Sequence, residues 1–268
     1  MHAITARHSF LTDFFVQLFG YREYLKQSVM RDLRKKYKRS ALGYLWTMLH
    51  PLGMMLIIGT VLSHVMQVPF KDYAIFFLIG LLAWNYFNST ALMSLHSVRA
   101  NSRLFGQIAL PKYIFVMSLV ASNFANYLLA LAPLFLIMIV AGHAIPWTVV
   151  LFPLIVLPLV IVTTGISLIL AVANVFFEDT LHLSEVALQA LYFLTPVLYS
   201  RDRLPPELIK FLVLNPLFFQ IEALRDVLFA GVIPDGTTYF LNLVASLCIL
   251  ALGLLVFRRS EDKFLYFI

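Results

Sequence analysis

The chain contains a single cysteine, Cys248, and few charged residues, which make up 13% of its 268 residues. One cysteine can form no internal disulfide and cannot build a cysteine-based zinc cluster. None of the 11 glycines is followed by lysine, so the chain lacks the Gly-Lys-Ser/Thr ending of a phosphate-binding loop and cannot bind ATP by that mechanism. The seven histidines show no metal-ligand spacing. We therefore expect no catalytic site, metal or cofactor in this chain.

Apolar residues make up 61% of the chain, and its mean hydropathy of +0.86 lies outside the range of soluble domains. A helix needs about 20 mainly apolar residues to cross a bilayer. The expected spans are residues 42–66, 73–95, 113–141, 147–176, 186–199 and 239–257, of which the fifth crosses only if the preceding residues extend it. We therefore expect an all-α membrane protein whose six transmembrane helices form one domain over residues 41–268.

The segment between the last two expected spans contains two short runs that cannot cross a membrane. Residues 201–210 are charged and include two consecutive prolines, and residues 211–221 are apolar but contain Asn215 and Pro216. Irregular backbone is tolerated at membrane depth only where protein or water covers it. The pattern favours a re-entrant pair of half-helices at about residues 200–237.

The first 40 residues predict an amphipathic helix that lies on the membrane surface. Apolar side chains recur there at spacings of three and four, namely Phe10, Phe14, Leu18, Tyr21, Leu25, Val29 and Leu33. The run 10–19 is short and interrupted by Asp13, so we expect no cleaved signal peptide. The helix could act as a topology anchor, bind lipid phosphates or dock a cytoplasmic partner.

The basic residues are distributed unequally between the two sides of the expected spans. With both termini in the cytoplasm, 15 of the 20 lysines and arginines lie on the cytoplasmic side. Cytoplasmic loops of membrane proteins carry such an excess, so we predict cytoplasmic N- and C-termini. We interpret the net charge of +6 as a membrane-surface feature, with no nucleic-acid partner.

Four stretches occur together in a recognisable order. They are Arg31-Asp-Leu-Arg-Lys-Lys-Tyr-Lys-Arg-Ser-Ala-Leu-Gly-Tyr-Leu-Trp46 with His50-Pro51-Leu52; Gly80-Leu-Leu-Ala-Trp-Asn-Tyr-Phe87; Leu194-Thr-Pro-Val-Leu-Tyr199 with Leu204-Pro205; and Leu214-Asn-Pro-Leu217 with Arg225. From about Arg31 to its end, the chain resembles the membrane subunits of ABC exporters for O-antigen, capsule and teichoic acid. It departs from that family at Phe177-Glu178-Asp179, where an Arg-Asp pair is usual, which puts in doubt any salt bridge of that pair.

The resemblance implies the membrane subunit of an ATP-driven exporter, which moves a lipid-linked polysaccharide such as O-antigen across the cell inner membrane. It also implies a second copy of the chain, and two partner subunits that bind ATP and magnesium. An ABC permease for drugs or lipids and a membrane-embedded glycan-synthesis enzyme remain alternatives. An ion-driven transporter is disfavoured, because the spans hold almost no carboxylates and show no obvious repeat.

Residues 96–111 join two spans on the expected cytoplasmic side, and residues 97–105 can form about two helical turns. Arg99 and Arg103 are four residues apart and would share one face. An ordinary basic loop explains this pattern too, but the resemblance implies a coupling helix seated on the ATPase. The candidate coupling residues are Arg99, Asn101, Ser102, Arg103 and Leu104, and the candidate N-terminal interface is Arg31, Arg34, Lys35, Lys36 and Tyr37.

Aromatic residues make up 15% of the chain and offer apolar faces on which sugars could stack. The candidates for a substrate path are Trp84, Tyr86, Phe87, Tyr192, Phe193 and Tyr199, although tryptophan and tyrosine also favour membrane interfaces. Asparagines at positions 85, 88, 123, 126 and 174 lie within spans, and we expect interhelical hydrogen bonds at least from Asn123 and Asn126. Glu222, Arg225 and Asp226 are either ion-paired outer-gate residues or solvated interface charges.

Overall fold

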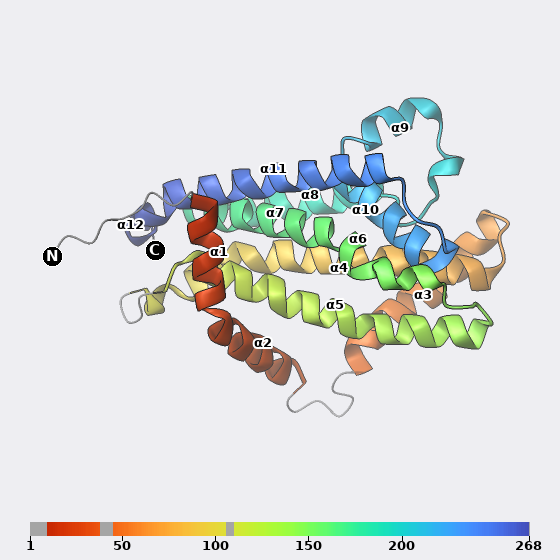
Figure 1. Cartoon of the computed structure of the whole chain (residues 1–268), viewed down its shortest axis with the longest axis horizontal. Helices are drawn as coiled ribbons and strands as arrows, with labels where there is room; N and C mark the ends of the chain where they lie inside the picture. The colour runs from red at the N-terminus through yellow and green to blue at the C-terminus, as the bar shows by residue number, and fades with distance from the viewer. Residues whose placement is uncertain (1–9, 38–44, 106–109, 268) are drawn as a thin grey trace.

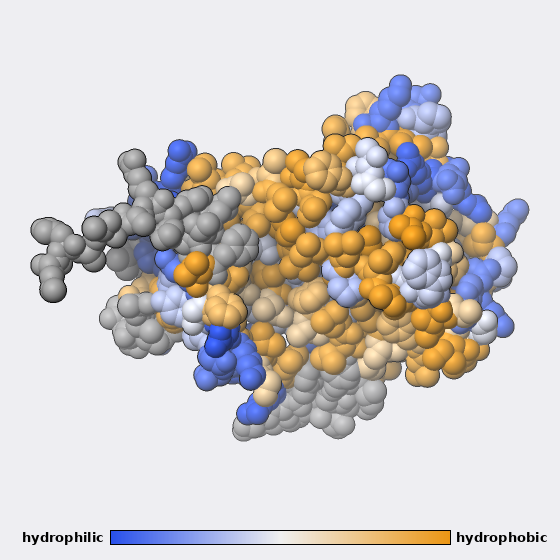
Figure 2. Space-filling view, viewed as in Figure 1, coloured by the Kyte–Doolittle hydropathy of each residue, from blue (hydrophilic) through white to orange (hydrophobic). Residues whose placement is uncertain are grey.

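A computed structural model describes residues 10–37, 45–105 and 110–267, and in that part of the chain every regular element is a helix. The long helices lie side by side along the longest axis of the molecule (Figure 1). Figure 2 shows an apolar surface over the middle of this bundle, with hydrophilic residues gathered toward its two ends. This distribution is that of a protein whose middle faces lipid.

Five helical segments in the described residues are long and apolar enough to cross a membrane. They are α3 (Leu45–Val65), α4 (Phe70–Ala100), α5 (Tyr113–Ala141), the stretch Trp147–Phe176 that comprises η2 (Trp147–Leu151), α6 (Phe152–Ile155) and α7 (Leu157–Phe176), and α11 (Gly236–Ser260). Each coincides with an expected span. Long apolar runs therefore sufficed to locate these helices.

The expected span at 186–199 does not form a helix of spanning length. The helix there, α8 (Thr180–Leu194), has 15 residues, or about 22 Å at 1.5 Å per residue, against roughly 30 Å of hydrocarbon. Six spanning helices were predicted, and within the described residues five pass the length criterion. The helix stops at Leu194 because Pro196 follows, and the residue before a proline is disfavoured in helical geometry.

The segment that contains α8 runs nonetheless from one end of the bundle to the other. At its start, Glu178 Oε1 lies 2.6 Å from Arg99 Nη1, in the last turn of α4. After its end, Arg203 Nη1 donates to the Met66 carbonyl at 2.9 Å, just before α4 begins. Asp72 lies in the first turn of α4, near Met66, and we call the two ends the Arg99 end and the Asp72 end of the bundle.

Short helices follow α8 at the Asp72 end: η3 (Arg201–Arg203), α9 (Pro206–Leu212), α10 (Pro216–Arg225) and the π-helical turn η4 (Asp226–Ala230). The Asn215 side chain caps α10 by accepting from the Leu217 N–H at 3.0 Å, and its Nδ2 donates to Thr195 Oγ1 at 2.8 Å. Gly231 ends the turn in the left-handed conformation, which costs glycine little. Helices α9 and α10 lie where the two half-helices were expected, and the depth at which they lie in the membrane remains a prediction.

The N-terminal region forms two helices where one was predicted, α1 (Phe10–Gly20) and α2 (Arg22–Tyr37). They meet at an angle at Tyr21, directly after Gly20, which weakens helical continuity (Figure 1). Helix α2 packs on α5, where Ser122 Oγ donates to Asp32 Oδ2 at 3.1 Å. The expected membrane-surface helix is thus held against the bundle.

Helix α4 forms the centre of the bundle, and α7 and α11 pack against each other beside it. Gly165 of α7 faces Gly253 of α11, and a Cβ atom on Gly165 would lie 2.7 Å from the Ile249 carbonyl carbon. A Cβ atom on Gly253 would overlap the Gly165 carbonyl oxygen. The two backbones touch, as is common where small residues meet between membrane helices.

The Arg99 end is closed by aromatic side chains from four parts of the chain. Phe264 of α12 (Phe264–Phe267) is fully buried, with ring centroids 5.4 Å from Phe257 and 6.2 Å from Phe176. The Lys112 ammonium donates to the Glu261 carbonyl and lies 5.6 Å from the Phe105 ring. The C-terminal residues therefore hold Lys112 at the start of α5.

Candidate functional site

The residues predicted to couple the chain to an ATPase lie at the Arg99 end, but they form no single coupling helix. Helix α4 continues to Ala100, and the 3-10 turn η1 (Ser102–Leu104) follows. Asn101 separates them with φ −108° and ψ 10°, and its Nδ2 donates to the Ser97 carbonyl at 2.7 Å. The prediction of one helical face for Arg99 and Arg103 is therefore wrong, because the helix ends between them.

Arg99 and Arg103 also differ in their surroundings. Arg99 pairs with Glu178 at 2.6 Å and donates to the Val175 carbonyl at 3.1 Å, so it ties α4 to the α7–α8 junction. Arg103 is exposed, and Ser102 beside it is half-buried. Residues 106–109 and the side chain of Leu104 lie outside the described part. Of the two described arginines, Arg103 is therefore the one that is free to meet a partner protein.

Glu178, where the family usually has arginine, is the partner of Arg99. This position therefore forms an ion pair of its own, with the acid on the α7–α8 junction and the cation on α4, which differs from any salt bridge of the usual Arg-Asp pair. Glu178 is 79% exposed and Arg99 30% exposed, so the pair is screened and contributes at most about 1 kcal/mol.

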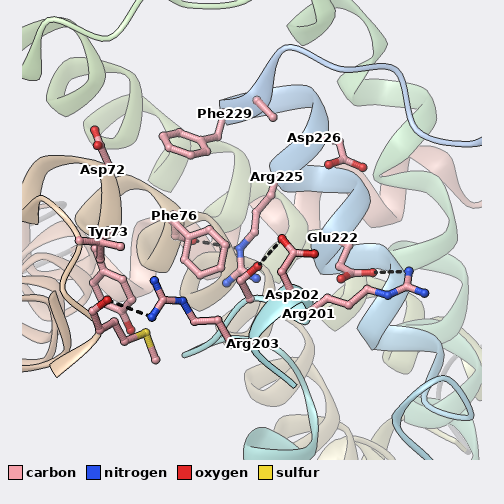
Figure 3. A pocket seen from close by; sticks show the side chains of 14 residues that line it. Asp72, Tyr73, Phe76, Arg201, Asp202, Arg203, Glu222, Arg225, Asp226 and Phe229 are labelled. Carbon is pink, nitrogen blue, oxygen red and sulfur yellow. Dashed lines mark hydrogen bonds and ion pairs between the residues drawn. The ribbon is translucent and has the colours of Figure 1, made fainter. Parts of the chain in front are cut away.

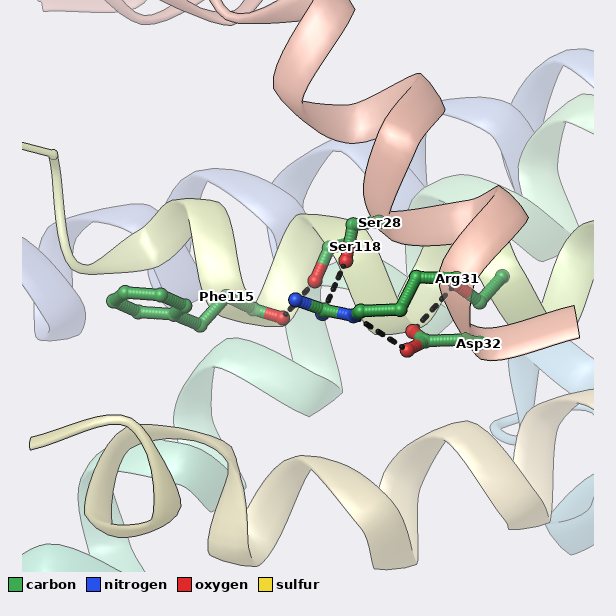
Figure 4. A network of polar contacts seen from close by, with 6 residues as sticks. Ser28, Arg31, Asp32, Phe115 and Ser118 are labelled. Carbon is green, nitrogen blue, oxygen red and sulfur yellow. Dashed lines mark hydrogen bonds and ion pairs between the residues drawn. The ribbon is translucent and has the colours of Figure 1, made fainter. Parts of the chain in front are cut away.

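The described basic residues of the predicted N-terminal interface are exposed, but the Arg31 side chain is also bound to its own helix. Arg31 Nη2 donates to Ser28 Oγ at 2.9 Å, and its Nε lies 3.4 Å from Asp32 Oδ1 (Figure 4). Arg34 and Lys35 are exposed and free to meet a partner or lipid. The side chains of Lys36 and Tyr37 lie outside the described part.

Three of the six predicted substrate-path aromatics line one groove of about 460 Å³ between α3, α4 and α8. Trp84 packs edge-on against Tyr192 with ring centroids 5.3 Å apart, and Tyr192 meets Phe193 at 5.4 Å. Trp84 and Tyr192, which were predicted from the sequence to line one substrate path, are more than 100 positions apart in the chain. Whether a glycan passes along this groove remains a prediction.

The other three predicted path aromatics lie outside this groove. Phe87 is 1% exposed in the core, and the Tyr86 ring stacks on Tyr127 with centroids 5.6 Å apart. The hydroxyl of Tyr199 donates to the Phe193 carbonyl at 2.8 Å. Phe87 thus serves packing in the single chain, and Tyr199 braces the end of α8.

The span asparagines have different partners. Asn174 Nδ2 donates to the Leu95 carbonyl of α4 at 2.8 Å, which joins α7 to α4. Asn123 of α5 reaches Met93 Sδ of α4 at 3.6 Å, a weak interhelical contact of the kind expected. Asn126 Nδ2 donates to the Ser122 carbonyl of its own helix at 3.0 Å. The hydrogen bond of Asn174 between α7 and α4 is therefore stronger than the contact that Asn123 makes between α5 and α4.

A cavity of about 730 Å³ opens at the Asp72 end and holds the three predicted gate residues (Figure 3). Its charged lining side chains are Asp72, Arg201, Asp202, Arg203, Glu222, Arg225 and Asp226. They come from α4, η3, α10 and η4, which the fold brings together at this end. The cavity is therefore a polar mouth on an otherwise apolar bundle.

Arg225 is buried, at 5% exposure, and it binds backbone oxygens. Its guanidinium donates to the carbonyls of Phe76 at 3.1 Å, Pro196 at 2.5 Å and Val197 at 2.8 Å, and it lies 3.5 Å from the centre of the Phe76 ring. Gly80 makes room for it, since a Cβ there would lie 2.7 Å from Nη2. The solvated-charge alternative is wrong for Arg225, which ties α10 to α4 and to the end of α8.

Glu222 pairs with Arg201 at 3.7 Å, and the pair lies within the same mouth. Burial raises the pKa of Glu222 to about 7, although Arg201 lowers it. Burial also raises the pKa of Asp226, with Arg225 lowering it. Of the three predicted gate residues, Glu222 therefore takes part in an ion pair, and its partner Arg201 lies outside the predicted set.

The chain belongs to the ABC-2 type transporter family, whose sequence profile matches residues 23–229. It is 30% identical over 251 residues to the O-antigen export system permease protein RfbA of Myxococcus xanthus, covering 92% of this chain and 96% of that protein. A protein of the same name from Klebsiella pneumoniae is 29% identical over 239 residues, covering 87% of this chain and 90% of the relative. The polysialic acid transport protein KpsM of Escherichia coli is 26% identical over 242 residues, covering 88% and 93%.

Proposed function

We propose that this chain is the membrane subunit of an ATP-driven exporter that moves a lipid-linked polysaccharide, such as O-antigen, across the cell inner membrane. The observation that carries the proposal is the similarity over nearly the full length to permeases named for O-antigen and polysialic acid transport. The bundle of apolar helices with polar ends supports it. In this role the chain carries out a step of lipopolysaccharide biosynthesis, the transport of the polysaccharide across the membrane.

The energy for export comes from a second polypeptide. No glycine of this chain precedes a lysine, so the phosphate-binding loop of an ATPase has to be supplied by a partner that holds ATP and magnesium. Membership of the ABC-2 type transporter family supports ATP-binding partner subunits, and we propose two of them with two copies of this chain. The exposed apolar face of α8, with Leu183, Val186 and Phe193, needs lipid or a second copy against it.

The chain crosses the membrane six times in this proposal, with both termini in the cytoplasm. Residues 178–203 connect the Arg99 end to the Asp72 end, and α8 together with the turn residues 195–200 serves as the additional crossing. Helices α9 and α10 return to the Asp72 end and form the re-entrant pair. The excess of basic residues at the Arg99 end supports a cytoplasmic position for that end.

The ATPase docks at the Arg99 end, on the η1 turn and on α2. Arg103 is exposed there, and the Arg99–Glu178 pair joins the turn to the next loop at that end. The clustered aromatics of Phe257 and Phe264 make the site rigid, which a lever needs. Polysaccharide passes along the groove of Trp84 and Tyr192 and leaves through the mouth held by Arg225.

The test is deletion of the gene in its host, followed by staining of surface polysaccharide and detection of glycan inside the cell. The proposal expects loss of surface glycan with intracellular accumulation, restored by the wild-type gene. Intact surface polysaccharide would favour the ABC permease for drugs or lipids. Loss of the glycan without intracellular accumulation would favour a role in glycan synthesis.

A further inference from the structure

A recess of about 450 Å³ between α3, α4 and α5 is lined by amide side chains. Asn85 and Asn88 are three residues apart in α4, and Asn123 and Asn126 are three apart in α5, so each pair shares one helix face. The volume lies within the range of small-molecule sites. Two polar helix faces are therefore turned toward one hollow in the apolar part of the bundle.

Several of the polar groups in this recess are not used by the fold. Within the described residues, the side chains of Asn85 and Asn88 form no hydrogen bond, and the hydroxyl of Tyr127 is buried without a partner. Ser89 adds an exposed hydroxyl. The recess is thus built to be satisfied by a polar occupant.

The chemistry of the lining selects the occupant. An amide offers both donors and an acceptor, which matches a hydroxyl group that can donate and accept. Among the described lining residues there is no lysine, arginine, aspartate or glutamate, and His50 is the sole imidazole. The lining therefore suits uncharged hydroxyls and offers no fixed cation for a carboxylate or a phosphate.

The recess adjoins the aromatic groove, because His50, Asn85 and Asn88 line both. Trp84 and Tyr192 in the groove offer the apolar faces that sugar rings need, and the amides offer hydrogen bonds to their hydroxyls. In the groove Glu185 is the one described lining residue with a fixed charge, and it is an acid. An anionic sugar would find no counter-charge in either place.

We propose that the amide recess of α4 and α5 binds neutral, hydroxyl-rich sugar residues of the exported glycan and discriminates against acidic ones. This inference rests on the proposed function and names its substrate class. It distinguishes the chain from its relative named for polysialic acid transport. Hydroxyls could also come from a glycerol headgroup of a lipid, so the experiment separates these sources.

The test uses the fact that Cys248 is the one cysteine and lies exposed on α11, away from the recess. Asn88→Cys and, separately, Asn85→Cys are made in a Cys248→Ser background, with Thr237→Cys at the exposed start of α11 as the control. Each protein is placed in phosphatidylcholine nanodiscs and treated with a charged methanethiosulfonate reagent. Labelling rates are measured with neutral oligosaccharides of glucose, mannose, galactose and rhamnose, and with a sialic acid oligomer.

The proposal expects at least one neutral oligosaccharide to slow labelling of both recess cysteines about tenfold at roughly ten times its dissociation constant, where about a tenth of the sites are free. The control cysteine should keep its rate, and sialic acid should protect none of the three. Protection by sialic acid, protection by no neutral sugar, or recess cysteines that do not react at all would overturn it. So would equal slowing by phosphatidylglycerol nanodiscs without sugar, which would assign the recess to a lipid headgroup.

The proposed function can fail separately. If deletion of the gene leaves surface glycan intact, the exporter assignment fails whatever the labelling shows. If deletion removes an acidic glycan, export stands and the neutral-sugar inference is wrong.

Discussion

Arg225 gives the most demanding test of the packing, because one side chain holds three segments together. Its guanidinium donates to the carbonyls of Phe76, Pro196 and Val197 and lies over the Phe76 ring. Replacing it with methionine leaves three carbonyls without their donor. At the low end of about 1 kcal/mol for each, because the adjoining mouth of about 730 Å³ admits water, the loss is about 3 kcal/mol.

A loss of this size is measurable by thermal unfolding of the purified protein in detergent. About 2–4 °C per kcal/mol is usual for chains of comparable length, so Arg225→Met should unfold about 6–12 °C below the wild type. Arg225→Lys keeps a positive charge but cannot reach three carbonyls with a planar fork, and it should recover only part of the loss.

Gly80→Ala provides a matched test from the other side of the contact. Alanine favours a helix by about 1 kcal/mol over glycine, so propensity alone predicts a more stable protein. Because the new Cβ would lie 2.7 Å from Arg225 Nη2, we expect destabilisation instead. An unchanged melting temperature for Arg225→Met, or a raised one for Gly80→Ala, would refute the reasoning.

Three further predictions concern other parts of the chain. Gly253→Val should separate α11 from α7 at Gly165 and lower the yield of folded protein by size-exclusion chromatography, whereas Gly236→Ala, in open space, should not. The folded state raises the pKa of Glu222 to about 7 from 4.5, so the contribution of Glu222 to stability is greatest below pH 4.5 and is lost as the pH rises to about 7. The melting temperature of Glu222→Gln should therefore increase relative to that of the wild type between pH 4.5 and about 7. A difference in melting temperature that stays constant over this window would contradict the raised pKa. Arg103→Glu should abolish glycan export while ATP hydrolysis continues; normal export would remove Arg103 from the coupling site.

The structural features that could be predicted from the sequence are those that depend on long local patterns of residues. The five spanning segments were located by their apolar runs, and α5 occupies the expected residues 113–141 without deviation. Groups of residues could also be predicted from their aromatic character within expected spans, as with Trp84 and Tyr192 in one groove. The apolar runs and the aromatic residues can both be recognised within single stretches of the sequence.

What could not be predicted depends on contacts between distant residues. The motif around Gly80 and the motif with Arg225 were each visible, but their direct contact joins positions 145 residues apart. The ends of helices were also missed. Gly20 divides the N-terminal helix and Asn101 ends α4, and a single glycine or asparagine is no certain signal of a helix end.

The central claim is that this chain is a transport pathway powered by a separate ATPase, and inside-out membrane vesicles test it most directly. Vesicles that contain the chain and its ATP-binding partner should accumulate polysaccharide in their lumen when ATP is added, and vesicles without the chain should not. Purified chain alone should hydrolyse no ATP. Accumulation that is unchanged without the chain, or ATP hydrolysis by the chain by itself, would contradict the account.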